Sequence, residues 1–223
     1  MSRIYCEFHL TGKERSLSHC GSDENMKPYD TMSRDTAGTE DRDLVEIKES
    51  SLPIYDGIIL HVFRDTVRLP DGGTAPREVI RHNGAACVIP IDAEGNVLMV
   101  RQCRYAIGAV TLEIPAGKLD RKGEDMLACA MRELREETGA EAKEWLDLGT
   151  FYGAAAYADE RIGMFAAKDL TFTEQKLDDD EFLRCERIPL ATLSEMVLRG
   201  EIADGKTQVA VLKLAELRRR GQF

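Results

Sequence analysis

Three glutamates, Glu133, Glu136 and Glu137, lie close together in the stretch RELREET. An α-helix turns by about 100° per residue, so Glu136 and Glu137 would fall within about 60° of Glu133. Like charges at this spacing repel each other and destabilise a helix. A divalent cation would relieve the repulsion, and Mg²⁺ prefers oxygen ligands of this kind. The spacing therefore predicts a magnesium site, and the plainer alternative is a solvated charged face.

The sequence around these glutamates favours the metal site over a solvated face. The preceding loop, Pro115-Ala116-Gly117, contains a glycine that permits close approach of the backbone to a ligand. We predict a helix over 124–138 that ends at Gly139. Its opposite side is apolar at helical spacing, so we expect that side to pack on a core. The apolar residues are Leu127, Ala130, Met131 and Leu134.

The composition narrows the class of protein. The chain has 223 residues and is 43% hydrophobic, which is enough for one domain with a core and an appendage. The net charge of −10 argues against a nucleic-acid partner. No apolar run approaches the roughly 18 residues of a membrane span, and the N-terminus lacks the apolar core of a signal peptide. The six cysteines are scattered, which argues against zinc and disulfides. We expect a cytoplasmic protein.

The order of predicted elements indicates an α+β fold, with a mixed, mainly antiparallel sheet between helices. Residues 1–44 are polar and are interpreted as a disordered or non-native extension. Residues 45–84 would hold an N-terminal β-hairpin, and 85–220 the main domain. Strands are expected at 58–69, 77–81, 85–91, 97–102, 145–152, 161–167 and 182–188, and further helices at 189–198 and 204–219.

Residues 113–140 as a whole resemble the Nudix box, G-x5-E-x7-R-E-U-x-E-E-x-G-U, in which U is a bulky aliphatic residue. Gly117 begins the motif, Glu124 is its first acid, and Arg132 to Ala140 complete it. Six residues, rather than five, separate Gly117 from Glu124, and Ala140 is small for the final position. The extra residue falls in the turn before the helix, where an insertion costs little.

The resemblance covers about residues 45–220 and points to the ADP-ribose pyrophosphatase branch of Nudix hydrolases. The segments that carry it are Val100–Tyr105, Leu112–Gly117 and Ile202–Thr207. After the box, this branch usually reads Ser-Pro-Gly-aromatic-x-Asp/Ser-Glu. Residues 154–160 keep the aromatic residue, the acid and the glutamate, whereas Ala155 replaces the proline that marks a preference for ADP-ribose.

The resemblance implies Mg²⁺-dependent hydrolysis of ADP-ribose to AMP and ribose 5-phosphate, with Mn²⁺ as a possible substitute for Mg²⁺. It implies metal binding by Glu133, Glu136, Glu137 and the carbonyl of Ala116. Arg132 would support this cluster through an ion pair with Glu124. The general base would be Glu160, with Glu136 as the rival, and this choice needs geometry that sequence does not supply.

Residues outside the box would bind the substrate. An arginine fork suits phosphate oxygens, so Arg104 is the first candidate. Arg101 and Glu113 are further candidates, and Tyr55 would contribute to an adenine clamp, which in this branch often forms across a homodimer interface. Two alternatives stay open: a nucleoside diphosphate sugar or dinucleotide other than ADP-ribose, and a non-catalytic Nudix-fold binding module. The three glutamates argue against the second.

Overall fold

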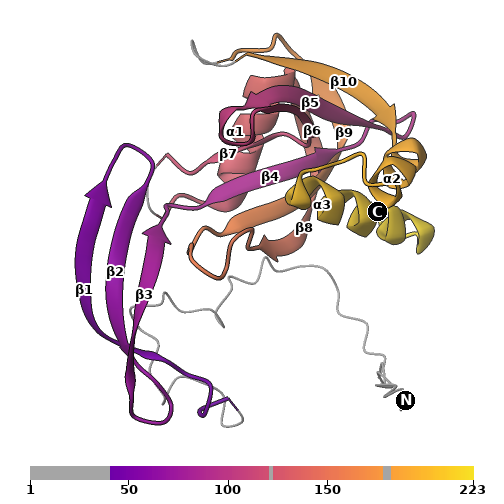
Figure 1. Cartoon of the computed structure of the whole chain (residues 1–223). Helices are drawn as coiled ribbons and strands as arrows, with labels where there is room; N and C mark the ends of the chain where they lie inside the picture. Colours follow the sequence, from indigo (N-terminus) through magenta and orange to yellow (C-terminus); the bar gives the residue numbers. More distant parts are fainter. Residues whose placement is uncertain (1–40, 121–122, 178–181) are drawn as a thin grey trace, which may run out of the picture. The chain divides into compact units, whose positions relative to one another are not determined.

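The computed structural model describes residues 41–120, 123–177 and 182–223 (Figure 1). Its central sheet has the strand order β7-β4-β9-β8, in which β4 and β9 are parallel and the other pairs antiparallel. A second, antiparallel sheet has the order β10-β5-β6. The bounds are β4 Ala85–Pro90, β5 Asn96–Arg104, β6 Ala109–Glu113, β7 Ala116–Lys118, β8 Ala140–Phe151, β9 Ile162–Phe172 and β10 Leu183–Pro189.

Strand β4 is buried on both faces, as its uninterrupted apolar sequence requires. Ala85, Cys87 and Ile89 belong to a core shared with helices α2 (Leu190–Leu198) and α3 (Gly205–Arg219). The alternate residues Ala86 and Val88 belong to a second core shared with helix α1 (Met126–Thr138). The sheet therefore lies between helices, which confirms the predicted α+β arrangement (Figure 1).

Helix α1 begins and ends where the sequence provides caps. The Asp125 side chain accepts a hydrogen bond from Ala128 N at 2.8 Å, so the helix starts at Met126 and not at 124. Gly139 ends it with φ of 69°, and a Cβ there would lie 2.5 Å from Thr173 O. These two caps set the first and last residues of α1, the helix that carries the glutamates.

The buried side of α1 differs from the predicted one. Met131 is 42% exposed, whereas Cys129 is fully buried. Glu133 and Glu137 are also buried, at 7% and 2% exposure. The acidic residues therefore lie next to the apolar side of the helix and not opposite to it, because the buried arc runs from Cys129 to Leu134.

The N-terminal region is a sheet of three strands, β1 (Ile47–Asp56), β2 (His61–Arg68) and β3 (Thr74–Arg81). The predicted hairpin is present as β2 and β3. Strand β1 was not predicted, because most of its residues are exposed and it carries no alternating apolar pattern. Strands β6 and β7 were also missed, because they are only five and three residues long.

Residues 1–40 of the predicted N-terminal extension fall outside the described residues. Within the described part of the chain, no helix is long and apolar enough to cross a membrane.

Candidate active site

Two of the three glutamates of α1 contact the guanidinium of Arg132. Arg132 Nη1 donates to Glu133 Oε1 at 2.8 Å and to Glu136 Oε2 at 3.0 Å. Glu137 lies one turn beyond Glu133 on the buried side of the helix. The sequence thus places the three carboxylates on one side of α1, as the helical spacing predicted. Burial opposes the charge of Arg132, but contact with the carboxylates outweighs it and raises the pKa, so the guanidinium stays charged.

The loop before α1 lies directly against two of these glutamates. A Cβ atom on Gly117 would overlap the Glu133 carboxylate, so any other residue here would have to displace that carboxylate. The backbone N–H of Ala116 donates to Glu137 Oε2 at 3.1 Å. The main chain of β7 therefore reaches the carboxylates, which places Ala116 beside the predicted metal ligands.

The donor chemistry fits a hard divalent cation. Carboxylate oxygens come from Glu133, Glu136 and Glu137, and the backbone of Ala116 in β7 contacts Glu137. Across the described residues, no three His, Cys, Asp or Glu side chains are already gathered closely enough to hold a metal ion. In this arrangement Arg132 supplies the positive charge between Glu133 and Glu136. The residues therefore fit the predicted Mg²⁺, and their role as ligands stays a prediction.

Arg132 makes different supporting contacts from those predicted. Its Nη2 donates to Lys118 O at 3.1 Å and lies 3.6 Å from Asp120 Oδ1. Glu124 instead accepts a hydrogen bond from Asp120 N at 2.6 Å. The predicted Arg132–Glu124 ion pair is therefore wrong, because Glu124 precedes the N-cap of α1 and turns back to the loop. Arg132 supports the loop and the helix together.

Cys129 lies beside this cluster, with its Sγ 3.5 Å from Arg132 Nη2. Burial, followed by the neighbouring Glu133, raises the pKa of its thiol to about 12. A thiol that remains protonated is a poor nucleophile, and Cys129 instead packs in the core beneath α1.

Glu160 lies in a loop that is bonded to the end of β3. The backbone N–H of Asp159 donates to Ile80 O, and the Asp159 carboxylate accepts from His82 N at 2.8 Å. Arg81 links this carboxylate to the buried Asp65 of β2. Glu160 itself is partly exposed, with Oε1 3.6 Å from His82 Nδ1. Sequence reasoning did not single out Arg81 or His82, because their partners are distant in sequence. Glu160 as base stays a prediction.

Arg104 and Glu113 form a bidentate ion pair. Arg104 Nε and Nη2 donate to the two carboxylate oxygens of Glu113 at 2.8 and 2.6 Å. Thr111 Oγ1 and Lys206 Nζ also donate to this carboxylate. Burial opposes its charge, but these donors and the positive charge of Lys206 prevail and lower the pKa of Glu113 to about 2.

Arg104 and Glu113, both predicted to bind the substrate, differ in their access to solvent. Glu113 is 2% exposed and lies behind Arg104, whose side chain is 42% exposed. Arg104 is thus the group that an incoming phosphate can reach, and Glu113 is its buried ion-pair partner. Sequence reasoning missed Lys206, although the segment Ile202–Thr207 was part of the family resemblance.

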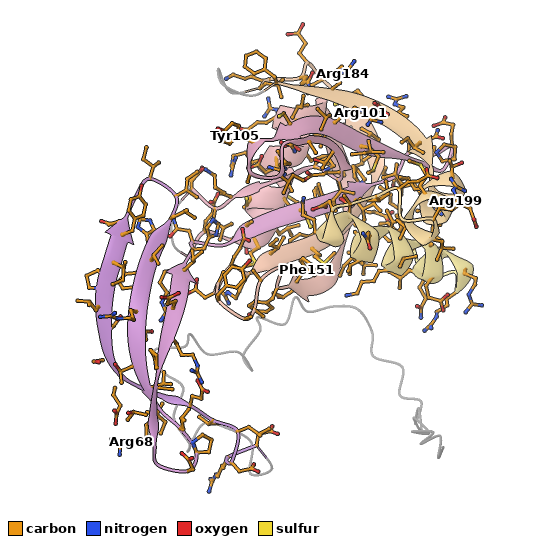
Figure 2. All side chains as sticks on the ribbon, in the orientation of Figure 1. Arg68, Arg101, Tyr105, Phe151, Arg184 and Arg199 are labelled. Atoms are coloured by element: carbon orange, nitrogen blue, oxygen red, sulfur yellow. The ribbon has the colours of Figure 1, made fainter. Side chains whose placement is uncertain are left out.

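Arg101 and Arg104 lie on opposite faces of β5. Residues three apart on a strand point to opposite faces. Arg101 Nε donates instead to Glu186 Oε1 at 2.6 Å on the neighbouring strand β10, and Figure 2 shows Arg101 near Arg184 in this sheet. Tyr55 lies on β1 and is 59% exposed. The roles of both in substrate binding stay predictions.

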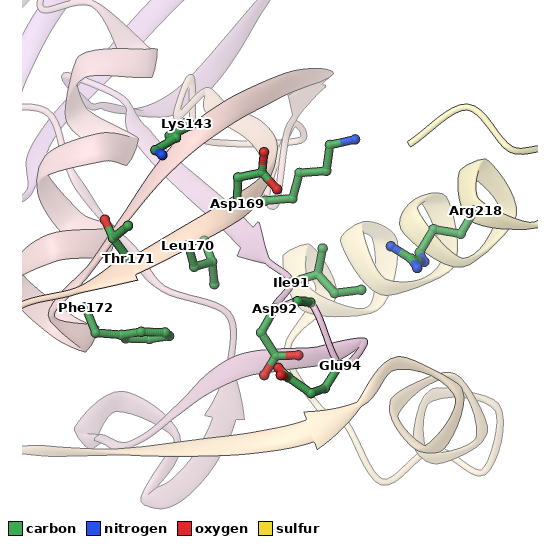
Figure 3. Close-up of a pocket in the computed structure, with 11 residues that line it drawn as sticks. Ile91, Asp92, Glu94, Lys143, Asp169, Leu170, Thr171, Phe172 and Arg218 are labelled. Atoms are coloured by element: carbon green, nitrogen blue, oxygen red, sulfur yellow. The ribbon is translucent and has the colours of Figure 1, made fainter.

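A separate hollow of about 520 Å³ lies away from these residues (Figure 3). It is lined by the turn after β4, by part of β9 and by Arg218 of α3. Its charged side chains have mixed signs, and none of the predicted site residues lines it. We therefore place the candidate active site at α1 and β7 and not in this hollow.

Comparisons with known proteins agree with this arrangement. Residues 81–209 match the Nudix domain, and residues 46–80 match the N-terminal domain of nucleoside diphosphate sugar hydrolases. An ADP-ribose pyrophosphatase of Bacillus subtilis (strain 168) is 38% identical over 160 residues, which cover 71% of this chain and 86% of the relative. A methanol dehydrogenase activator of Bacillus methanolicus is 40% identical over 160 residues, with the same coverage of both chains.

A solved structure described as an ADP compounds hydrolase has the same fold. Its TM-score is 0.70, and the match covers 80% of this chain and 97% of the other at 21% sequence identity. The Nudix match covers more than half of the chain and includes the whole of α1 with its preceding loop. Sequence motif, fold and relatives together show that this chain belongs to the Nudix hydrolase family.

Proposed function

We propose that the protein hydrolyses the pyrophosphate linkage of ADP-ribose, in a Mg²⁺-dependent reaction, to AMP and ribose 5-phosphate. The observation that carries the proposal is the cluster of Glu133, Glu136 and Glu137 against the backbone at Gly117. The name of the Bacillus subtilis relative supports ADP-ribose as the substrate. A relative of similar identity has a different name, so family membership does not by itself establish the substrate.

The residues divide the work of the reaction as follows. Glu133, Glu136, Glu137 and the Ala116 carbonyl would hold the cation, for which Mn²⁺ can replace Mg²⁺. Bound there, it would supply positive charge against the pyrophosphate and make the attacking water more acidic. Arg104 binds a phosphate oxygen through its fork. Arg132 keeps the acidic side of α1 against the loop at Lys118.

A carboxylate accepts the proton of the attacking water while the bond between phosphorus and the bridging oxygen breaks. We assign this task to Glu160, with Glu136 as the rival. Replacement of Glu160 by Gln tests the choice, with Glu174→Gln as a control outside the loop. We expect kcat to fall by about 100-fold or more, as for a lost general base. A change below about threefold would transfer the role to Glu136.

A second candidate function is hydrolysis of another nucleoside diphosphate sugar or a dinucleotide. The observation that favours it is Ala155, which stands where the ADP-ribose branch has proline. A non-catalytic binding module is the third possibility, and the intact set of three glutamates argues against it.

A substrate panel separates these three functions. The protein is incubated with Mg²⁺ and ADP-ribose, GDP-mannose, UDP-glucose, NADH or diadenosine polyphosphates, and phosphomonoester release is measured. We expect the highest kcat/KM for ADP-ribose. A higher value for another nucleotide would move the assignment to that substrate, and no turnover on any of them would leave the binding module.

Metal binding has a readout of its own. Mn²⁺ is titrated into protein treated with a chelator, and free Mn²⁺ is measured by electron paramagnetic resonance. We expect bound Mn²⁺ in the wild type, and activity that returns when Mg²⁺ is added. Absence of bound Mn²⁺ at millimolar concentration would contradict the metal site even if the protein turned over a substrate.

We further propose a homodimer in the cytoplasm that uses the N-terminal sheet. Apolar side chains are exposed along and after β1, and a second subunit would cover them: Leu52, Ile54, Tyr55, Ile59 and Leu60. Sedimentation velocity tests the proposal. A monomer at micromolar concentration would contradict it.

A further inference from the structure

Lys206 is a buried cation with no part in the reaction described above. It lies in the first turn of α3 and is 7% exposed. Its Nζ donates to Glu113 Oε2 and lies 3.0 Å from Asp204 Oδ1. A lysine is rarely buried unless its charge is paired. Lys206 therefore has this position because of the two carboxylates that it contacts.

Glu113 is bound by two cations that differ in access. The side chain of Arg104 is 42% exposed, whereas that of Lys206 is 9% exposed. Both approach the same oxygen, Oε2, while Arg104 Nε and Thr111 Oγ1 share Oε1. A substrate anion can thus reach the arginine, and the lysine stays behind with Glu113.

The second cation changes what happens when Arg104 leaves Glu113. Without Lys206, that departure would leave a carboxylate buried with one hydroxyl donor, which is strongly unfavourable. With Lys206 in place, Glu113 keeps an ionic partner and the Thr111 hydroxyl. When Arg104 leaves Glu113 for a phosphate oxygen, it then replaces one ion pair by another of similar kind.

Lys206 is itself held in place by the cap of α3. Asp204 accepts hydrogen bonds from Thr207 N at 2.9 Å and from Thr207 Oγ1 at 2.6 Å. Thr207 Oγ1 in turn accepts from Ile114 N at 3.0 Å, next to Glu113 in the chain. The cap thus joins the start of α3 to the end of β6, and it sets the distance between Lys206 and Glu113.

We propose that Lys206 is a positioning residue that releases Arg104 from Glu113, so that Arg104 can bind a phosphate of the substrate. The inference rests on the proposed function for its substrate, a nucleoside diphosphate sugar. It predicts a defect in substrate binding and not in the chemical step, because Lys206 is too deeply buried to touch the reacting atoms.

Steady-state kinetics on ADP-ribose provide the first test, with Lys206→Met as the variant and Lys213→Met, on the same helix, as the control. We expect Lys206→Met to raise KM about tenfold and to change kcat less than twofold, since Arg104 remains committed to Glu113. The double variant Lys206→Met/Glu113→Gln should bring KM back to within about threefold of wild type, because a neutral amide at position 113 binds Arg104 less tightly than a carboxylate does. An unchanged KM in folded Lys206→Met, or an equal loss in kcat, would overturn the proposal.

Glu113→Gln alone keeps the test decisive if Lys206→Met does not fold. This variant weakens the competitor for Arg104, so KM should fall below the wild-type value. A rise in KM beyond about threefold would mean that Glu113 orients Arg104 for the substrate, which contradicts release.

Nuclear magnetic resonance provides a readout that is independent of turnover. The side-chain Nε–H signal of Arg104 is assigned with an Arg104→Lys variant and followed during titration with α,β-methylene-ADP. In the wild type we expect the chemical shift of this signal to change as Arg104 exchanges Glu113 for a phosphate of the ligand. In Lys206→Met the chemical shift should stay unchanged at the same ligand concentration. A wild-type signal that does not move would refute the exchange. If ADP-ribose is not hydrolysed but the signal moves, the proposed function fails and the exchange stands.

Discussion

Two clusters of charged side chains, one on α1 and one around Glu113 at the end of β6, differ in their balance of positive and negative charge. At α1, the carboxylates of Glu133 and Glu136 share the guanidinium of Arg132, and Glu137 accepts a hydrogen bond from Ala116 N. At the start of α3, Glu113 and Asp204 meet two cations, Arg104 and Lys206. The first cluster has an excess of negative charge and the second is neutral.

The difference in charge balance indicates which cluster binds a metal ion and which binds the substrate. An excess of close carboxylates is relieved by a divalent cation, so the α1 cluster suits a metal. A neutral cluster needs no added ion, but one of its cations can change partners. The α1 cluster would therefore bind the metal, and the Glu113 cluster would present an arginine to the substrate anion.

The largest effect is expected from the α1 cluster. Replacing Glu137 by Gln removes a buried charge while it keeps the side-chain shape, and we expect kcat to fall by at least about 100-fold. Phosphomonoester release and Mn²⁺ binding are measured together, with Glu141→Gln on the exposed strand β8 as the control. Near-normal activity with intact Mn²⁺ binding would refute Glu137 as a ligand.

Gly117→Ala tests whether the backbone must touch the same cluster. The added Cβ would overlap the Glu133 carboxylate, so we expect about a tenfold to 100-fold loss of activity. The free energy of unfolding should fall by about 1–3 kcal/mol, as measured in urea. In Gly73→Ala, a control in the turn of the N-terminal sheet, the new Cβ would lie 3.2 Å from Asp71 Oδ1 and should be tolerated. Equal effects in both variants would argue against close packing at Gly117.

The Glu113 cluster should show itself in the pH dependence of stability. The pKa of Glu113 is lowered in the folded state, despite its burial, to about 2 from an ordinary value of 4.5, through Arg104, Lys206 and Thr111. Its contribution to stability is therefore fully present above pH 4.5 and is lost as the pH falls toward 2. It amounts to something on the order of 3 kcal/mol. Urea unfolding of wild type and Glu113→Gln should give a free-energy difference that shrinks from about pH 5 to about pH 3. A constant difference would contradict the ionised pair.

The smallest effect is expected outside both clusters. Arg101 pairs with Glu186 on the surface of the second sheet, so Arg101→Ala should change KM less than about twofold and stability by about 0–1 kcal/mol. Kinetics on ADP-ribose measure the first, and urea unfolding the second. A tenfold rise in KM would return Arg101 to the substrate site, as the sequence interpretation had it.

Most residues of the α1 cluster are close together in the sequence, so their arrangement could be predicted from it. Helical spacing places Glu133, Glu136 and Glu137 on one side, and the caps Asp125 and Gly139 lie within the same stretch. Gly117 is also close in sequence to Glu133, whose carboxylate a Cβ at position 117 would overlap. The partners of Arg132 could not be predicted from the sequence, because the conformation of the turn before the helix decides whether Glu124 or Asp120 approaches Arg132.

The Glu113 cluster and the N-terminal sheet depended on tertiary structure. Lys206 and Glu113 are 93 residues apart, and no periodicity connects them. Strand β1 has no buried side to produce an apolar pattern, so only its pairing with β2 defines it.

The sequence by itself determined the helix, its acidic side and the family, because helical periodicity and end caps act over a few residues. The tertiary structure decided which cations share Glu113 and which face Arg101 occupies. The reason is physical: strand pairing brings distant residues together, and the burial that follows requires each charge to find a partner.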